Sequence, residues 1–312
     1  MKNKIKVISV VGPTASGKTG LSVELAKLLD GEIISADSMQ IYKGMDIATA
    51  KPDDAEMQGV PHHLMGFLPP EQTYSVAMFT DDARSLIADI TKRNKLPFIV
   101  GGTGLYVDAL LNNIRFHDEE RNEEVSTELR ERFQKEGIEP LLEELLQVDP
   151  DSAQRLSKER NPKRIIRALE FYKTTGKTIT EQLALSRTEE SPYKAIKIGL
   201  SFSDREKLYE RINKRVDDML SRGLLEEARQ VLSSPLSQTS AMAIGYKELA
   251  PYISGEASLD DCVEKLKRET RRYAKRQLTW FRRDKEINWL YVDEYNSFDE
   301  LFDAAVQIIN KG

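Results

Sequence analysis

The octapeptide GPTASGKT at residues 12–19 constrains the fold more than any other feature of this sequence. It matches the pattern G-x-x-x-x-G-K-[ST], in which backbone N–H groups surround a phosphate, the lysine reaches a terminal phosphate and the hydroxyl binds Mg²⁺. A buried-strand run at residues 6–11 precedes it, and leucines follow at helical spacing, at Leu21, Leu25, Leu28 and Leu29. This order of strand, glycine loop and helix points a helix N-terminus at an anion. Alone, the loop predicts nucleotide or ATP binding as readily as any other phosphate ligand, and a glycine turn without a ligand is the alternative.

Further apolar runs predict a sheet behind this loop. Four more strand candidates follow the first one, with helical patterns between them, at residues 32–36, 96–100, 194–200 and 287–292. A parallel sheet with helices on both faces accommodates this alternation. We therefore predict an α/β fold of the P-loop NTPase type, with a parallel sheet flanked by helices.

The chain between the third and fourth strands is too long for one crossover connection. It is highly charged, and its apolar residues predict helices near residues 125–133, 141–146 and 165–172. We expect an inserted helical domain at 118–191 that sits over one end of the sheet. The P-loop core would then consist of residues 1–117 and 192–312.

Composition excludes several classes of protein. The 312 residues contain one cysteine, Cys262, which rules out an internal disulfide and a multi-cysteine zinc module. No targeting segment and no apolar run of membrane-spanning length is visible, so we expect a soluble, cytoplasmic protein without membrane contact. No heptad pattern or exposed apolar stripe stands out, which favours a monomer without an obligate protein partner.

The net charge is −5, but the charges are unevenly placed. Residues 267–283 contain eight basic side chains and one acid, Glu269. On a helix, Arg268, Arg272, Lys275 and Arg276 share one side, while Leu266, Tyr273 and Trp280 share another. A solvated helix face is the ordinary explanation, and a surface for nucleic-acid phosphates is the interpretation we prefer.

Two motifs follow predicted strands, where open parallel sheets bind ligands. Asp37 comes directly after the second strand, where it could accept a proton, help to organise Mg²⁺, or serve only as a turn residue. GGTGLY at 101–106 follows the third, and its glycines would let backbone approach a ligand closely, beside the Thr103 hydroxyl. A simple glycine turn is the alternative. This strand end lacks the acid that ATP-hydrolysing loop proteins use for magnesium.

Basic residues recur on two predicted helices, and two histidines are adjacent. Either arginine-rich helix could clamp a diphosphate, although solvated helix faces are commoner; the residues are Lys163, Arg164 and Arg167 on one, and Arg211 and Arg215 on the other. His62 and His63 have no ligand partners at suitable spacing, so we predict no metal site there.

Together these motifs resemble the bacterial tRNA dimethylallyltransferases, which prenylate N6 of adenosine 37 beside the anticodon. The resemblance covers nearly the whole chain, through GPTASGKT (12–19), DSMQIYKGMDIATAKP (37–52), GVPHHL (59–64), GGTGLYV (101–107), NPKRIIRALE (161–170), AIGYKE (243–248) and RQLTWFRRD (276–284). Many kinases and ATPases share the first motif, whereas the second and fourth, in this order, are far more specific.

The resemblance implies the following roles. Asp37 is the general base at the adenine amine, Thr103 assists it, and Lys18 and Arg215 act on the diphosphate side. The diphosphate of dimethylallyl diphosphate lies in the loop formed by Gly12, Pro13, Thr14, Ala15, Ser16, Gly17, Lys18 and Thr19, with Mg²⁺ as the cofactor on Thr19. The anticodon stem-loop of tRNA contacts Asp37, Ser38, Met39, Gln40, Thr103, Lys163, Arg164, Ile165, Ile166, Arg167, Gly245, Tyr246, Lys247, Arg272 and Arg276.

Three other functions are weighed against this one. A small-molecule kinase shares the loop and sheet, but the missing acid after the third strand opposes it. A prenyltransferase acting on free AMP has no use for the large insertion or the basic helix. A module that only binds RNA would not need Lys18 and Asp37 together.

Overall fold

The computed structural model describes residues 4–114, 122–186 and 190–312. The chain forms two compact units, one made of Met1–Leu111 with Ser191–Gly312 and the other of Asn112–Glu190. The predicted start of the insertion, residue 118, lies outside the described residues. The two units are called unit 1 and unit 2 below, and each is described by itself.

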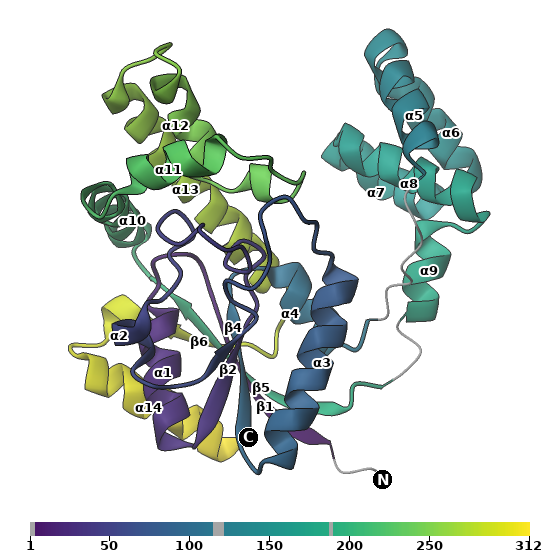
Figure 1. Ribbon diagram of the computed structural model, residues 1–312. Helices are drawn as coiled ribbons and strands as arrows, with labels where there is room; N and C mark the ends of the chain where they lie inside the picture. Colours follow the sequence, from purple (N-terminus) through teal and green to yellow (C-terminus); the bar gives the residue numbers. More distant parts are fainter. Residues whose placement is uncertain (1–3, 115–121, 187–189) are drawn as a thin grey trace. The chain divides into compact units, whose positions relative to one another are not determined.

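Unit 1 is built on a parallel sheet, drawn in Figure 1. Its described strands lie in the order β3-β2-β4-β1-β5-β6, and neighbouring strands all pair in parallel. This confirms the predicted α/β fold. The short edge strand β3 was missed, because two residues carry no pattern of alternation. The strands are β1 (Ile5–Val11), β2 (Gly31–Ser35), β3 (His62–His63), β4 (Leu96–Gly101), β5 (Tyr193–Ser201) and β6 (Asn288–Tyr291).

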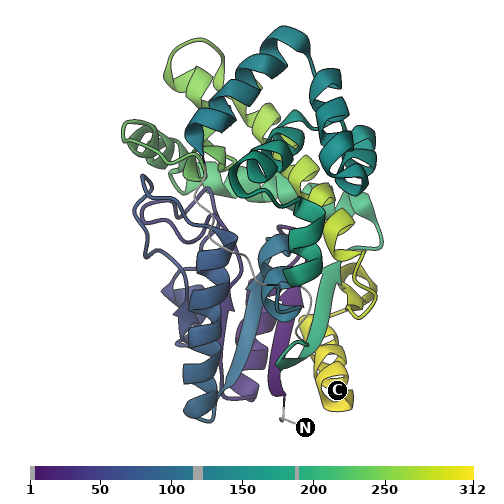
Figure 2. The same ribbon diagram turned by 90° about the vertical axis from the view of Figure 1, so that its right-hand side faces the viewer.

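Helices cover both faces of this sheet, as Figure 1 and Figure 2 show. Neighbouring strand residues point to opposite faces, so Val7 and Ile34 enter one apolar core while Ile8 and Ile33 enter the other. The first core includes residues of α3 and α4, and the second includes residues of α1 and α14. The helices that connect strands, with the last one, are α1 (Lys18–Leu28), α2 (Asp54–Met57), α3 (Val76–Lys92), α4 (Gly104–Leu111) and α14 (Phe298–Lys311).

Further helices of unit 1 lie beyond the carboxyl ends of the strands (Figure 1). The longest, α13, buries Leu266 and exposes Arg268, Arg272, Lys275 and Arg276, which confirms the two predicted faces. Cys262 is buried on the same helix. The elements are α10 (Arg205–Ser221), α11 (Leu224–Leu232), η1 (Ser240–Met242), α12 (Tyr246–Ile253), α13 (Leu259–Phe281) and η2 (Val292–Glu294).

Unit 2 is helical and has its own apolar core, which includes Leu129, Leu141 and Leu169. Three helices match the predicted ones, and the structure adds α7 and α9. Pro150 begins α7, where a missing N–H costs no hydrogen bond. The helices are α5 (Glu123–Glu136), α6 (Glu139–Val148), α7 (Pro150–Glu159), α8 (Pro162–Thr175) and α9 (Ile179–Ser186). Across the described ranges of both units, no helix is long and apolar enough to span a membrane.

Candidate active site

The loop at residues 12–19 joins β1 to α1, and two glycines fix its shape. Gly12 has a φ of +147°, and a Cβ there would lie 2.3 Å from the carbonyl oxygen of Leu200 in β5. Gly17 has a φ of +91° and directly precedes α1. Because side chains are excluded from the first position and strained at the second, this tight loop requires both glycines.

The end of α1 at this loop is suited to an anion. Among the described residues no side chain caps the helix, and its first turn contains no acid. The Ser16 hydroxyl is buried and has no hydrogen-bond partner in the described structure. Free backbone N–H groups and an unpaired hydroxyl would be satisfied by phosphate oxygens, so the loop fits the predicted diphosphate.

Lys18 supplies the cation of the loop. Its ammonium donates to the carbonyl oxygen of Pro13 at 2.8 Å. Burial lowers the pKa of Lys18 to about 8, with a further contribution from the Arg215 guanidinium, while Asp37 acts in the opposite direction. A bound anion would supply the negative charge that this partly buried ammonium lacks.

Two arginines of α10 reach the same loop. Arg215 donates from Nη1 to the Thr14 hydroxyl at 3.1 Å, and Arg211 donates from Nε to the Ala15 carbonyl at 3.1 Å. Burial lowers the pKa of Arg215, although a guanidinium stays charged in proteins. The sequence alone left open whether Arg211 is a solvated residue or binds a diphosphate. The structure brings it to the loop beside Arg215.

Asp293 holds the start of α10, and sequence analysis did not identify it. Its carboxylate accepts from the Ser203 N–H and hydroxyl, both at 2.8 Å, and from the Asp204 N–H at 3.0 Å. These bonds lower the pKa of Asp293 to about 2, against the opposing effect of burial. Asp293 therefore fixes the segment that leads into the two arginines.

Asp37 lies where β2 ends, next to the loop that lines the same cavity. Its Oδ1 accepts from the N–H groups of Met39 at 2.9 Å and Gln40 at 3.4 Å, which is the geometry of a turn aspartate. Within the described residues Oδ2 accepts no hydrogen bond. The turn role and the predicted base role are therefore compatible, because one oxygen holds the turn and the other is free.

Thr103 lies beside this turn, as the resemblance implied. Its Oγ1 accepts from the Ser38 N–H at 3.0 Å and donates to the Ser38 hydroxyl at 3.3 Å. Its own N–H donates to the Ala36 carbonyl at 3.1 Å. The structure thus brings together two predicted catalytic residues, Asp37 and Thr103, that are far apart in the sequence.

The glycines around Thr103 approach other parts of the protein closely. A Cβ at Gly101 would lie 2.2 Å from the Ala36 carbonyl oxygen, and one at Gly104 would lie 2.3 Å from the Trp280 ring. Gly101 also lines the cavity, so the expectation that these glycines admit a ligand stays a prediction. They admit the end of β2 and helix α13, whose packing leaves no room for a methyl group.

Helix α13 contributes site residues that sequence analysis placed elsewhere or overlooked. Tyr273, expected on an apolar face, lines the cavity, and burial raises the pKa of its phenol while hydrogen bonds from Thr103 and Gln277 lower it. Leu266, Thr270 and Gln277 line the cavity from the same face. Their spacing of three and four residues was the available signal, but it also fits simple core packing.

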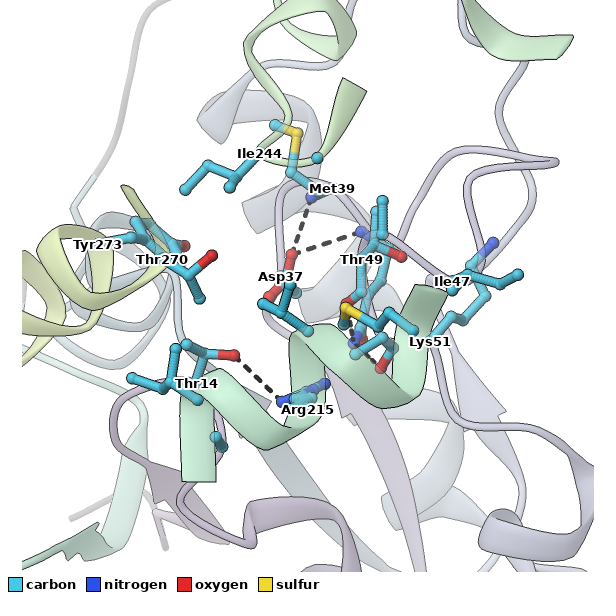
Figure 3. A pocket seen from close by; sticks show the side chains of 18 of the residues that line it. Thr14, Asp37, Met39, Ile47, Thr49, Lys51, Arg215, Ile244, Thr270 and Tyr273 are labelled. Atoms are coloured by element: carbon cyan, nitrogen blue, oxygen red, sulfur yellow. Dashed lines mark hydrogen bonds between the residues drawn. The ribbon is translucent and has the colours of Figure 1, made fainter. Parts of the chain in front are cut away.

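These elements enclose a cavity of about 820 Å³ (Figure 3). Figure 3 shows Asp37 near its centre, the hydrogen-bonded pair of Thr14 and Arg215 on one side, and Tyr273 of α13 on another. Charged groups of the loop and α10 line one part. Apolar side chains contribute elsewhere, at Met39, Ile47, Val216, Met219, Leu224, Ile244 and Leu266.

Glu227 of α11 fixes one wall of this cavity, and it too was missed. It accepts from the N–H groups of three successive residues, Asp46 at 2.9 Å, Ile47 at 2.7 Å and Ala48 at 2.9 Å. The Tyr246 hydroxyl donates to it at 2.9 Å. Tyr246 is buried, so the prediction that its side chain contacts tRNA is corrected: it supports the wall from behind.

The other residues predicted to contact tRNA fall into distinct environments in unit 1. Those that line the cavity are Ser38, Met39, Gln40, Gly245, Lys247 and Arg276. The Gln40 side chain is already engaged, because it accepts from Ser35 and donates to the Thr49 and Ala50 carbonyls. Arg272 is exposed on α13 and pairs with Glu269 at 2.7 Å.

Unit 2 presents three of its five predicted contact residues at its surface. Lys163 and Arg164 are exposed, and Arg167 is partly exposed on the same helix, α8. Ile165 and Ile166 are buried in the core of unit 2. The prediction that these two side chains contact tRNA is therefore corrected, because the helix turns them inward.

The donor set of the cavity fits Mg²⁺, although no cluster of three acidic, histidine or cysteine side chains suited to a metal occurs among the described residues. Thr19 and Asp37 both line the cavity. Mg²⁺ is ordinarily held by one or two protein oxygens together with water and substrate phosphates. Neither His62 nor His63 lines the cavity, and His63 is bonded to Glu32 at 2.8 Å.

Comparisons with known proteins agree with this site. A family model described as IPP transferase matches residues 40–284, and one described as isopentenyl transferase matches residues 5–66. The tRNA dimethylallyltransferase of Thermoanaerobacter sp. (strain X514) is 46% identical over 300 residues, which are 95% of each chain. That of Halalkalibacterium halodurans is 47% identical over 308 residues, 98% of this chain and 96% of the relative.

Solved structures extend the similarity to the fold. The tRNA isopentenylpyrophosphate transferase from Bacillus halodurans is 43% identical with a TM-score of 0.73, covering 99% of this chain and 96% of that one. A eukaryotic dimethylallyltransferase acting on tRNA is 30% identical with a TM-score of 0.80, covering 98% and 80%. The chain therefore belongs to the IPP transferase family, as a prenyltransferase of the tRNA dimethylallyltransferase type.

Proposed function

We propose that the protein transfers the dimethylallyl group of dimethylallyl diphosphate to N6 of adenosine 37 in tRNA and releases diphosphate. The observation that carries the proposal is the position of Asp37, with Thr103 bonded to its turn, beside an anion-binding loop in one cavity. A leaving diphosphate requires an anion site. An amine that becomes acidic during the reaction requires a carboxylate with a free oxygen.

On the donor side, the loop N–H groups, Lys18 and Arg215 would bind the diphosphate. Negative charge grows on this group as the carbon–oxygen bond breaks, so donors already in place lower the barrier. Mg²⁺, held at Thr19, would supply further positive charge against the diphosphate. The Ser16 hydroxyl would gain a phosphate oxygen as its missing partner.

On the acceptor side, Asp37 would take the proton of the adenine amine. This amine is delocalised into the ring and becomes strongly acidic only as its bond to the allylic carbon forms. The nitrogen–carbon bond forms, the carbon–oxygen bond breaks with its electron pair leaving on diphosphate, and the proton moves to Asp37. Thr103, bonded to Ser38, would keep the carboxylate turn aligned.

The cavity suits two ligands at once. Its apolar lining can hold a five-carbon chain, and its volume of about 820 Å³ lies within the range of small-molecule sites. Adenosine 37 is stacked in an anticodon loop and would be flipped into the cavity. The exposed lysine and arginine side chains of α13 and α8 would bind phosphates of the anticodon stem-loop. Unpaired bases of the loop would also be recognised.

The test is incubation of the protein with Mg²⁺, unmodified tRNA and labelled dimethylallyl diphosphate, with ATP, AMP and free adenosine as controls. We expect label on tRNA alone, at adenosine 37, with one diphosphate released per transfer. Consumption of ATP without label on RNA would instead identify a kinase, and label on AMP would identify a prenyltransferase of free nucleotides.

A further inference from the structure

Gln277 is a buried amide on α13 that none of the steps above uses. Its side chain is 5% exposed, and both ends of its amide are bonded. Oε1 accepts from the Thr14 N–H at 2.9 Å, and Nε2 donates to the Gly102 carbonyl at 3.0 Å. Thr14 follows β1 and Gly102 follows β4, so a single side chain connects the loops of two neighbouring strands.

The Thr14 contact reaches the donor side of the site. Thr14 belongs to the phosphate loop, and its hydroxyl accepts from Arg215 at 3.1 Å. Gln277 bonds the backbone of the same residue, so Thr14 is held on one side by α13 and on the other by α10. The position of the diphosphate loop therefore depends on Gln277.

The Gly102 contact reaches the acceptor side. Gly102 directly precedes Thr103, which accepts from the N–H of Ser38, the residue after Asp37. Tyr273 lies one turn before Gln277, and both residues line the cavity. A continuous series of hydrogen bonds and adjacent residues thus runs from Arg215 through Gln277 to Asp37.

The contact between Gln277 and Gly102 is also tight, which restricts the residues that can occupy position 277. A Cβ at Gly102 would lie 2.1 Å from Nε2 of Gln277, so the amide fills the space that the glycine leaves. Glutamate has the same shape but offers no donor to the Gly102 carbonyl, and leucine offers neither a donor nor an acceptor. Only an amide of this length satisfies both loops.

We propose that Gln277 is a positioning residue that sets the separation between the phosphate loop and the Asp37 turn. The amine and the departing diphosphate must face each other across the allylic carbon, and a displacement of about 1 Å can cost ~100-fold in rate. This inference rests on the roles proposed above for the loop and for Asp37.

The test compares Gln277→Glu and Gln277→Leu with matched controls at Gln230, an exposed residue of α11. The measurements are the single-turnover rate at saturating donor and tRNA, the Kd of dimethylallyl diphosphate and the melting temperature. For Gln277→Glu we expect a rate loss of ~100-fold with a donor Kd within ~3-fold, because the Thr14 N–H keeps its acceptor. For Gln277→Leu the same rate loss should come with a donor Kd raised ~10-fold.

The control variants Gln230→Glu and Gln230→Leu should match the wild type in all three measurements. An unchanged single-turnover rate in Gln277→Glu would overturn the proposal. So would a loss that equals the unfolded fraction at the assay temperature, because the residue would then act only on folding.

A second set of variants separates hydrogen bonding from packing. Gly102→Ala pushes a methyl group against Gln277, and Gln277→Ala removes the collision. If Gln277 acts through its amide, the double variant stays as slow as Gln277→Ala; recovery of the rate would show that only space matters and would overturn the proposal. A wild type that transfers no label overturns the proposed function and this inference together, whereas unimpaired Gln277 variants overturn this inference alone.

Discussion

On the proposed donor side of the cavity the groups expected to bind the diphosphate come from residues 12–19 and one face of α10, whereas on the proposed acceptor side Asp37 and Thr103 come from loops after two different strands. The donor groups are mostly backbone N–H groups of a loop that glycines shape locally. The acceptor pair depends on bonds between segments 65 residues apart, such as that from Ser38 to Thr103. The phosphate loop is local in the sequence, although Arg211 and Arg215 reach it from α10, whereas the acceptor pair exists only in the folded sheet.

This difference indicates which substitutions should impair each side of the cavity. A local loop changes mainly through its own residues, so its variants should affect donor binding. A pair assembled from distant loops also depends on residues that touch no substrate, among them Glu227 and Gln277. Each of the following experiments changes a residue on one side of the cavity and also measures whether the function of the other side is affected.

The largest effect is expected from Asp37→Asn. The amide oxygen can still accept from the Met39 N–H, so the turn is kept while the base is lost. We expect turnover to fall by ~10³-fold, with the Kd values of tRNA and donor within ~3-fold of the wild type. Asp303→Asn, at an exposed position of α14, is the control. An active Asp37→Asn enzyme would exclude Asp37 as the base.

Lys18→Ala should produce the next largest effect, and it should fall on the donor side. Loss of one preorganised donor to the leaving group typically costs ~10²–10³-fold, and we expect this in kcat/KM for dimethylallyl diphosphate. The Kd of tRNA should stay unchanged. Lys92→Ala on α3 is the matched control, and an equal loss in both variants would contradict a specific role.

Charge reversal at Arg272 and Arg276 should weaken tRNA binding without affecting the donor. Both side chains are exposed on α13, where they would contact phosphates. We expect a Kd for tRNA raised ~10-fold in low salt and a shallower dependence on salt concentration. Reversal of Lys92 and Lys311, which changes the net charge equally, should leave both quantities unaltered.

Glu227→Gln tests the wall behind the acceptor side. An amide oxygen accepts more weakly than a carboxylate, so the three N–H groups of residues 46–48 lose part of their support. We expect kcat to fall ~5-fold with the donor Kd unchanged, and the neighbouring Glu226→Gln to behave as the wild type. A change in donor Kd alone would show that this wall belongs to the donor half.

At pH 8 the smallest effect is expected, from a pH dependence of donor binding. The pKa of Lys18 is lowered to about 8 without ligand, and the diphosphate favours the protonated ammonium. Donor affinity is therefore full below pH 8 and falls as pH rises through it, about twofold at pH 8 and ~10-fold at pH 9. Calorimetry in two buffers should detect proton uptake on binding, and Lys18→Arg should remove the dependence over this range.

The phosphate loop and the sheet behind it could be predicted because their signals are local. Lys18 and Thr19 stand at fixed offsets in one motif, and each main strand is a short run rich in apolar residues. Asp37 could be placed near the loop because carboxyl ends of parallel strands share one edge of the sheet. The family resemblance then supplied roles for Thr103 and Arg215 that residue patterns had left open.

Residues that act through long-range contacts could not be predicted in the same way. Asp293 and Glu227 lie outside every motif, and Gln277 lies in a motif that assigns it no role; each bonds backbone N–H groups that are distant in sequence. Ile165 and Tyr246 failed as predicted tRNA contacts for the opposite reason: they lie within family motifs, but the fold buries their side chains. Membership of a motif gives a position and not the direction in which a side chain points.

The glycines at 101, 102 and 104 affect how mutational data on this enzyme should be interpreted. A scan of all substitutions would find these positions intolerant and close to the reacting groups, which is the usual signature of ligand contact. Here the intolerance comes from Ala36, Gln277 and Trp280, whose atoms lie within 2.1–2.3 Å of where a methyl group would be. Substrate analogues would give no rescue at these sites, whereas a smaller residue in place of Trp280 would relieve the contact at position 104.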